Sequence, residues 1–341
     1  MNDKPTLSIC IPTYNRGNYL KELLLSIINN NIRENIKGKI EICVSDNNST
    51  DNTEVVMAEI QKLSDIKIKF HKNHQNMGAD FNYLKSVEIS NGTYCWLIGS
   101  DDAITTNSIN EIIDLIEYND DVGIFLFDRI ETDINMKPYR YRKWLREDIK
   151  TLKIDTHNHS ELSNYFLHVR SLGGIFSYLS SIIVKKSLWD SVKFDDIFIG
   201  TAYAHVYILL SILVSGTKFM YINKAYVLCR TGNDSFFQNL VQRFLLDIDG
   251  YLKLREKVIK TESLGIDFIE IIKYEHPFYN IIRIYSFSNK EMWNSNIKPK
   301  LLKIGYSEVE LRNIERYGFI YKKTLFLRKL LSKIKKILKS R

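Results

Sequence analysis

Short apolar runs alternate with amphipathic segments through the first hundred residues of the chain. Each apolar run has the length of a buried strand and is followed by a polar, turn-rich stretch, and the intervals carry apolar residues at helical spacing. We expect strands at 7–11, 40–44, 66–70 and 94–98, and helices at 18–28, 52–63 and 80–89. Four strands that alternate with helices predict a parallel sheet with right-handed crossovers. The polar stretches should therefore meet at the carboxyl edge of the sheet, where ligands bind in such folds.

One apolar segment reaches the length of a membrane span. Residues 197–217 carry no charged side chain, but Gly200, Thr201, His205 and Ser211 interrupt the segment. These interruptions favour a buried helix preceded by a loop, with a transmembrane helix as the alternative.

Composition is that of a folded protein with a full core. Hydrophobic residues make up 45% and charged residues 26% of the 341 residues, which suits one large α/β domain with an elaborated C-terminal part or two joined domains. Cys10, Cys43 and Cys95 each lie in an apolar run, and the four cysteines show no metal-ligand spacing. The first strand follows the N-terminus directly. We therefore expect a reducing, cytoplasmic compartment and no signal peptide.

The positive charge is concentrated at the C-terminal end. Of a net charge of +8, residues 322–341 supply nine basic side chains and no acidic one. Apolar residues recur there at helical spacing, at Phe326, Leu327, Leu330, Leu331, Ile334, Ile337 and Leu338. Such a basic amphipathic helix is typical of binding to an anionic membrane surface. Nucleic acid could use the same charge but would not require the apolar stripe, and a helix packed on the protein body or on a partner is a third interpretation.

Two adjacent carboxylates follow the fourth strand. The run at 94–98 leads through a glycine into Ser100, Asp101 and Asp102. Neighbouring negative charges repel, and the usual remedies are a shared proton, a cationic side chain or a metal ion. The alternative is that these residues cap a helix that begins near Ile104.

Four loop segments, in this order, resemble those of a known enzyme family. They are Leu7–Arg16 (LSICIPTYNR), Ile42–Asp51 (ICVSDNNSTD), Asn76–Asn82 (NMGADFN) and Gly92–Asp102 (GTYCWLIGSDD). Together they are similar to the N-terminal half of a family 2 glycosyltransferase with the GT-A fold, of the kind that acts in bacterial surface polysaccharide synthesis. The resemblance is strong over 7–103 and looser to about 235.

The resemblance implies a fold and a division of the chain. The fold class is α/β, GT-A, with a Rossmann-like, mostly parallel central sheet and a helical C-terminal extension. The GT-A domain would span 1–235, with a nucleotide-sugar half at about 1–103 and an acceptor half at about 104–235. A helical region at 236–320 and the basic amphipathic helix at 321–341 would follow.

The resemblance also implies roles for individual loop residues. Asp46 matches the position that hydrogen-bonds the nucleotide base, although an Asp there could serve only to form its own turn. Asp101 and Asp102 match the acidic motif that holds a divalent metal, Mn²⁺ or Mg²⁺, on the donor diphosphate. The nucleotide-binding positions implied are Pro12, Thr13, Tyr14, Arg16, Asp46, Asn48, Gly78, Ser100 and Asp101.

The chain departs from the family pattern at the acidic motif. Many relatives carry Asp-Xaa-Asp-Asp, and Gly99 stands where the first Asp would be. The ion would then be held by fewer protein oxygens, with Asp101 or Asp102 as the direct ligand.

A second departure concerns the general base of an inverting transfer. The family usually has an Asp in a Glu-Asp pair that opens a helix about a dozen residues before a glycine. Counting back from Gly216 places Ala204 and His205 there. His205 is the candidate base because its unperturbed pKa suits proton transfer, with a helix-capping or core histidine as the equal alternative. Asp195 and Asp196 are the reserve candidates. Arg230 resembles a position near the diphosphate or acceptor, and could instead be a solvated strand-end charge.

The second half of the chain is less regular. We expect a helix at 109–116, a strand at 122–127, a return to the core at 175–184 and helices at 240–259 and 266–284. The basic and aromatic stretch 136–146 favours a mobile flap or an acceptor-side loop, and contains Tyr139, Tyr141 and Trp144.

These inferences imply an inverting glycosyltransferase that moves a sugar from a UDP-, CDP-, GDP- or dTDP-sugar to a hydroxyl of a glycan. The resemblance and the basic tail together suggest two hypotheses, a lipid-linked acceptor and a peripheral position on the inner face of the cell membrane. No nucleic acid is expected as a partner. The main alternative is a catalytically inactive nucleotide-binding or scaffold protein, suggested by Gly99 and His205. A nucleotidyltransferase would need a phosphate-activating lysine near the first strand, for which Arg16 is a poor substitute.

Overall fold

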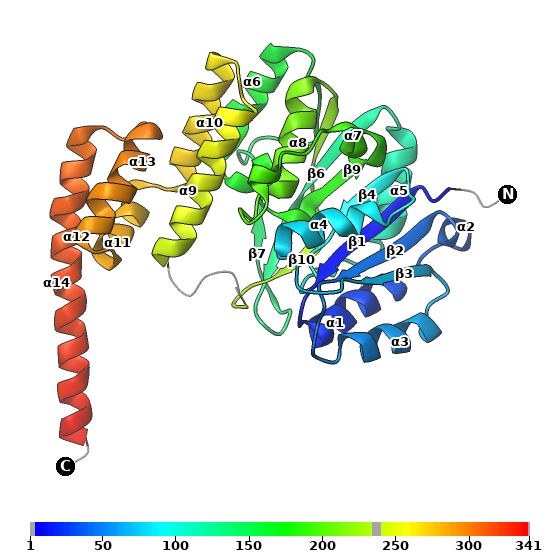
Figure 1. The fold of residues 1–341 in the computed structure, drawn as a ribbon, viewed down its shortest axis with the longest axis horizontal. Helices are drawn as coiled ribbons and strands as arrows, with labels where there is room; N and C mark the ends of the chain where they lie inside the picture. The colour runs from blue at the N-terminus through cyan, green and yellow to red at the C-terminus, as the bar shows by residue number, and fades with distance from the viewer. Residues whose placement is uncertain (1–3, 234–239, 340–341) are drawn as a thin grey trace. The chain divides into compact units, whose positions relative to one another are not determined.

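The computed structural model describes residues 4–233 and 240–339, with side chains up to residue 324. The chain divides into two compact units (Figure 1). The first contains residues 1–234 and 257–259, and the second contains residues 235–256 and 260–341.

The described part of the first unit contains one ten-stranded sheet flanked by helices. The strands run in the order β3-β2-β1-β4-β9-β6-β10-β5, with β7 paired to β6 and β8 paired to β10. The strands are β1 Leu7–Thr13, β2 Ile40–Asp46, β3 Lys67–Lys72, β4 Tyr94–Leu97, β5 Ala103–Ile104, β6 Val122–Thr132, β7 Pro138–Arg142, β8 Leu152–Asp155, β9 Ile182–Lys185 and β10 Lys218–Arg230. The helices are α1 Gly17–Ile28, α2 Glu34–Lys37, α3 Thr53–Leu63, α4 Ala79–Glu88, α5 Ser108–Tyr118, α6 His159–His168, α7 Lys186–Ser191 and α8 Ala204–Ser215.

The N-terminal half has the predicted alternation. β3, β2, β1 and β4 are neighbours and all parallel, which confirms the parallel sheet expected from the sequence. Helices α1 and α3 pack together on one side of these strands, and α4 packs against β1 and β2 on the other (Figure 1). The helix predicted at 18–28 begins at Gly17, with Arg16 at the cap position and no hydrogen bond from a capping side chain.

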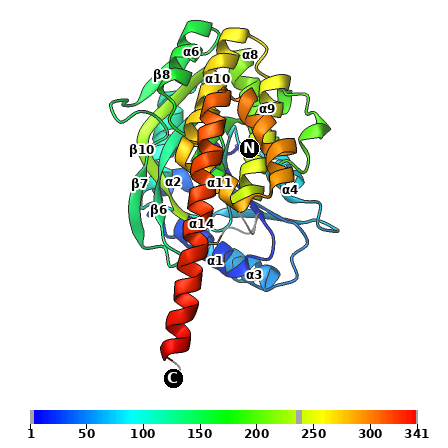
Figure 2. The same ribbon diagram turned by 90° about the vertical axis from the view of Figure 1, so that its left-hand side faces the viewer.

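The following segment corrects two expectations. No helix begins near Ile104: residues Ala103–Ile104 form the short strand β5, which pairs antiparallel with β10, and helix α5 begins only at Ser108. The acidic pair therefore does not cap a helix. The stretch 136–146 contains the strand β7, which pairs antiparallel with β6 (Figure 2). Its Trp144 is buried.

The long uncharged segment 197–217 is a buried helix after a loop, as expected. Helix α8 is apolar around most of its circumference, and eight of its residues are buried. No helix in the described part of the chain is both long and apolar enough to cross a bilayer.

The second unit consists of helices in its described residues. The predicted helix at 266–284 is interrupted at Pro277, which cannot donate a backbone hydrogen bond and lies at the N-cap of the next helix. The helices are α9 Leu240–Lys257, α10 Glu262–Glu275, α11 Phe278–Phe287, α12 Lys290–Met292, α13 Lys298–Lys303 and α14 Glu308–Lys339, with a π-helical turn at Trp293–Ile297. The apolar stripe predicted at 326–338 lies outside the residues whose side chains the structure describes.

Replacing Gly92 with Ala should destabilise the first unit. A Cβ there would lie 2.7 Å from the backbone N of Ser8 and 2.9 Å from the backbone O of Tyr94, so a strand has to move. We expect a loss of about 1–3 kcal/mol in the free energy of unfolding, the usual cost of overpacking. Gly38→Ala is the control, because nothing lies within 4 Å of the added Cβ. Urea unfolding of both variants measures the difference, and equal stabilities would contradict the close strand packing.

Candidate active site

The loop after β1 contacts the loops that follow β2 and β4. Thr13, at the end of β1, lies opposite Asp46 in the parallel register. Further along the loop, the Asn15 backbone N–H donates to Ser49 Oγ at 2.8 Å, and Arg16 Nη1 lies 2.7 Å from Asp101 Oδ2. The loops after these neighbouring strands thus converge around the exit of β1.

Asp46 is buried and forms the turn that follows its strand. Its carboxylate accepts hydrogen bonds from the Ser49 backbone N–H at 3.1 Å and from Ser49 Oγ at 2.5 Å. Burial raises the pKa of Asp46. The neighbouring Thr13 hydroxyl is buried without a hydrogen-bond partner among the described residues, so one polar atom at this edge is left for a ligand.

Asparagine side chains that sequence reasoning missed join these loops. Asn82, on α4, donates through Nδ2 to the backbone oxygens of Thr13 and Ser45, at 3.1 and 3.0 Å. Asn47 Oδ1 accepts from the Met77 backbone N–H at 2.9 Å. These amides fix the ends of β1 and β2 relative to the start of α4. In the sequence, the one indication of this role is that both asparagines lie in the polar segments that follow the strands.

The remaining predicted nucleotide positions lie along the same loops. Pro12 is buried in β1, whereas the Tyr14 side chain is 42% exposed and available for stacking. Asn48 and Gly78 both adopt positive φ, at 64° and 85°. Ser100 is buried ahead of the acidic pair.

The two adjacent carboxylates are stabilised differently. Asp101 Oδ2 pairs with Arg16 and also accepts from Asn233 Nδ2 at 2.6 Å. Asp102 is buried, and its Oδ2 accepts from the hydroxyls of Ser180 at 2.5 Å and Tyr178 at 2.7 Å. Burial and then the charge of Asp101 raise the pKa of Asp102 to about 7. The sequence did not predict the partners Tyr178, Ser180 and Asn233, because each lies more than 70 residues from the acidic pair in the sequence.

Arg230 is a buried structural cation rather than a solvated strand-end charge. Its side chain is 2% exposed, and its backbone N–H donates to Asp102 Oδ1 at 3.2 Å. The guanidinium donates to the backbone oxygen of Asp101 at 2.9 Å and to Glu22 and the Ile134 backbone oxygen. It also lies 4.6 Å from the centre of the Tyr19 ring.

A hollow of about 590 Å³ opens beside these groups. It is lined by Asn15, Arg16, Gly17, Asn18, Tyr19, Glu22, Asp51, Ile134, Asn135 and Arg230. Two guanidinium groups and the N-terminus of α1 contribute positive potential, while two carboxylates offset part of it. The volume lies within the range of pockets for small molecules.

Side-chain oxygens lie close to Gly99. A Cβ at Gly99 would lie 3.2 Å from Asp101 Oδ1, 3.4 Å from Asp102 Oδ2 and 3.6 Å from Ser180 Oγ, so three oxygens face the small space that the glycine leaves open. Magnesium and manganese prefer such oxygen ligands and are often held by one or two carboxylates and substrate phosphates. No group of three or more acidic, histidine or cysteine side chains suited to a metal occurs in the described residues.

His205 lies at the start of α8. Its ring is 3% exposed, Nε2 lies 3.2 Å from the Phe176 backbone oxygen, and Nδ1 has no hydrogen-bond partner among the described residues. Burial lowers its pKa to about 4. Of the reserve candidates, Asp195 caps a short 3-10 turn through the Ile197 backbone N–H, and Asp196 is exposed.

A carboxylate from another helix caps α8. Asp80, in the first turn of α4, accepts from the backbone N–H groups of Ala202 at 2.9 Å and Ala204 at 3.1 Å. The same two helices bring the rings of Tyr83 and His205 edge to face, 5.6 Å apart. Helix α8 has no acidic residue of its own in its first turn, and the carboxylate that caps it comes from α4.

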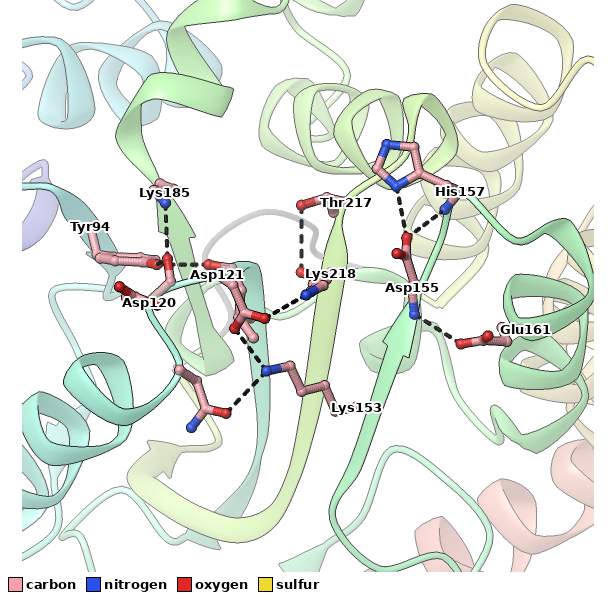
Figure 3. Close-up of polar contacts among 12 residues, drawn as sticks. Tyr94, Asp120, Asp121, Lys153, Asp155, His157, Glu161, Lys185, Thr217 and Lys218 are labelled. Atoms are coloured by element: carbon pink, nitrogen blue, oxygen red, sulfur yellow. Dashed lines mark hydrogen bonds and ion pairs between the residues drawn. The ribbon is translucent and has the colours of Figure 1, made fainter.

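A second charged cluster lies at the opposite edge of the sheet. Asp121 accepts from Lys153 and Lys218, each at 2.7 Å, where β6 and β10 begin (Figure 3). The hydrogen bond from Lys153, followed by the one from Lys218, lowers the pKa of Asp121 to about 2. The candidate site lies at the other end of these strands, because β6 ends at Thr132 and β10 ends at Arg230. The charged cluster is therefore separate from the candidate site.

Comparisons with known proteins assign the family. The model of glycosyl transferase family 2 matches residues 8–171. The chain is 37% identical to the abequosyltransferase RfbV of Salmonella typhimurium, over 92% of this chain and 93% of that protein. It is 27% identical to the GalNAc(5)-diNAcBac-PP-undecaprenol beta-1,3-glucosyltransferase of Campylobacter jejuni, over 76% of this chain and 75% of that one.

Solved structures show the same fold. The crystal structure of S. aureus TarS 1-349 in complex with UDP matches with a TM-score of 0.63 at 14% identity, over 93% of this chain and 88% of that one. The mannosyltransferase PcManGT from Pyrobaculum calidifontis in complex with GDP-Man and Mn²⁺ matches with a TM-score of 0.52 at 11% identity, over 93% and 86%. The GT-A fold expected from the sequence is thus confirmed, and the chain belongs to glycosyl transferase family 2 and is a glycosyltransferase.

Proposed function

We propose that this glycosyltransferase moves a sugar from a nucleoside-diphosphate sugar to a hydroxyl of a lipid-linked glycan, with inversion at the anomeric carbon. The observation that carries the proposal is the convergence of three strand-end loops at the exit of β1, where Arg16 pairs with Asp101 and the Asn15 backbone N–H donates to Ser49. The glycosidic bond to the diphosphate breaks, the acceptor oxygen bonds the opposite face of the same carbon, and the acceptor proton passes to a base.

The donor would lie along the carboxyl edge of the strands. Asp46, the unpartnered Thr13 hydroxyl and the exposed Tyr14 ring would bind the base and ribose. The diphosphate would lie toward the hollow, where Arg16 can exchange the carboxylate of Asp101 for a phosphate oxygen. Arg230 is fixed by Asp101 and Glu22 and would add positive potential.

Asp101 and Asp102, facing the space at Gly99, would hold a divalent cation. When bound, such an ion offsets the charge that develops on the departing diphosphate. Ser180 and Tyr178 orient the carboxylate of Asp102 for this role. The PcManGT complex with Mn²⁺ supports the proposal.

His205 remains the candidate base. Its neutral form prevails above about pH 4, and the hydrogen bond between Nε2 and the Phe176 backbone oxygen leaves Nδ1 as the proton-accepting nitrogen. Because the ring is buried, acceptor binding would have to uncover it. Asp195 and Asp196 remain in reserve, and none of the three candidates lines the hollow.

The acceptor and the basic tail point to a membrane surface. The name of the Campylobacter relative includes a PP-undecaprenol acceptor. In this chain α14 continues to Lys339, through the segment whose sequence predicts a basic amphipathic helix. A cytoplasmic enzyme held at the inner face of the membrane would meet a lipid-linked acceptor there.

Asp102→Ala should reduce sugar transfer by at least about 100-fold, comparable with the loss of a group that stabilises transition-state charge. The assay measures release of nucleoside diphosphate from a panel of nucleotide sugars with and without Mn²⁺. Asp114→Ala is the matched control, since Asp114 is an exposed carboxylate on α5 paired with Arg33. Transfer that survives in Asp102→Ala would refute the role of this carboxylate, and nucleotide binding without turnover of any donor would favour the non-catalytic alternative.

His205→Gln tests the base. A general base contributes about 10²–10⁴-fold, so transfer should fall by that factor while donor binding, followed by thermal shift, is retained. Because burial lowers the pKa of His205 to about 4, its deprotonated form prevails from pH 5 to 8, and the wild-type rate should show no acid limb from this group there. The control is His159→Gln, an exposed histidine. If His205→Gln transfers sugar at the wild-type rate, His205 is not the base and its ring serves only in packing.

Truncation after Tyr321 should weaken binding to phosphatidylglycerol vesicles by at least about 100-fold, since each basic residue near an anionic surface contributes roughly 1 kcal/mol. Co-sedimentation measures this, with neutral phosphatidylcholine vesicles as the control. Replacing Leu330 and Ile334 with Ser keeps every charge and removes part of the apolar stripe. If this double variant binds as well as the intact chain, insertion of the apolar stripe into lipid is excluded. If the truncated chain binds as well as the intact chain, the tail has no role in vesicle binding.

A further inference from the structure

Two tyrosine side chains of β7 are exposed beside the candidate site. Tyr139 is 60% and Tyr141 is 47% exposed, although aromatic rings are normally buried in a core or an interface. Among the described residues β7 pairs with β6 alone and forms an edge of the sheet (Figure 2). A register shift opposite Glu131 and Thr132 places Tyr139 at a bulge, a device that redirects a side chain.

Both rings are held by their hydroxyl groups. Tyr141 donates to Asp128 Oδ2 at 3.0 Å, and the Tyr139 hydroxyl lies 3.3 Å from Thr231 Oγ1. Thr231 is fixed in turn, because its backbone N–H and its hydroxyl both donate to the Thr132 backbone oxygen. The rings are therefore anchored at one end while much of their surface remains open to solvent. A binding surface that is already ordered loses little entropy when it takes a ligand.

The hairpin that carries these rings also forms a wall of the hollow. Ile134 and Asn135, in the turn between β6 and β7, line the hollow, and Arg230 donates to the Ile134 backbone oxygen. The turn is rigid, because the Asp133 carboxylate accepts from the backbone N–H groups of Asn135 and Lys137, both at 2.9 Å. A substrate that extends out of the hollow over this wall would meet the β7 tyrosines.

We propose that Tyr139 and Tyr141 form a platform that binds the sugar rings of the acceptor glycan. The flat apolar face of a pyranose ring stacks on an aromatic ring, and its hydroxyl groups remain free to bond with water. The platform lies outside the hollow proposed for the donor, so it suits the distal units of an oligosaccharide acceptor. The inference rests on the proposed function and adds where the acceptor binds.

The test uses the full-length chain and saturation-transfer NMR with a panel of di- to tetrasaccharides of common hexoses and deoxyhexoses. Tyr139→Ala should weaken oligosaccharide binding about fivefold, as expected for one lost ring contact. Tyr139→Phe keeps the ring and should bind nearly as the wild type. Tyr118→Ala removes a tyrosine that is 89% exposed at the end of α5, and should have no effect.

Kinetics separate this platform from the donor site. With an acceptor from the panel, Tyr139→Ala should raise the acceptor KM about fivefold and leave kcat and the donor KM unchanged. The platform is refuted if no oligosaccharide binds the wild type, if Tyr139→Ala binds like Tyr118→Ala, or if the donor KM or phosphatidylglycerol binding changes instead. Absence of any nucleotide-sugar turnover in the wild type would refute the proposed function itself. Turnover with an unchanged acceptor KM in Tyr139→Ala would refute only the platform.

Discussion

The candidate site depends on holding two neighbouring carboxyl groups together, with Asp102 buried and Asp101 partly exposed. Asp101 and Asp102 follow each other directly, and like charges in a medium of low dielectric repel far more than in water. The first unit offsets this with one cation, Arg16, and with hydroxyl and backbone donors on Asp102. These donors come from the β1–α1 loop, from the segment before β9 and from the end of β10. The acidic pair is therefore stable only when several separate segments are in place together.

The sequence predicted the parts of this arrangement that are local. Alternating apolar runs identified β1 to β4, and the polar loops after them were correctly expected at one edge. It could not reveal Tyr178 or Ser180, because a hydroxyl 76 or 78 residues from its carboxylate leaves no periodic signal. Pairing across the sheet also overrode local preference. Residues near Ile104 became a strand because β10 supplies a partner.

The start of α8 shows how spatial contacts replace a missing sequence feature. Helix α8 begins with Ala204 and His205 and has no acidic residue in its first turn, so it lacks a favourable charge of its own at its positive end. Asp80 supplies that charge from α4, across more than 120 residues. This explains the stability of α8 independently of which group accepts the acceptor proton. It also links the start of α8 to the start of α4.

The position of Arg230 and Asn233 near the end of the first unit limits how the enzyme can be divided. Both residues contact Asp101, and both lie about 60 residues beyond the segment that matches the family model. An expression fragment cut at residue 171 would lack β9 and β10 as well as these partners, leaving sheet edges open to aggregation. The shortest fragment that keeps the acidic pair's partners extends through residue 233.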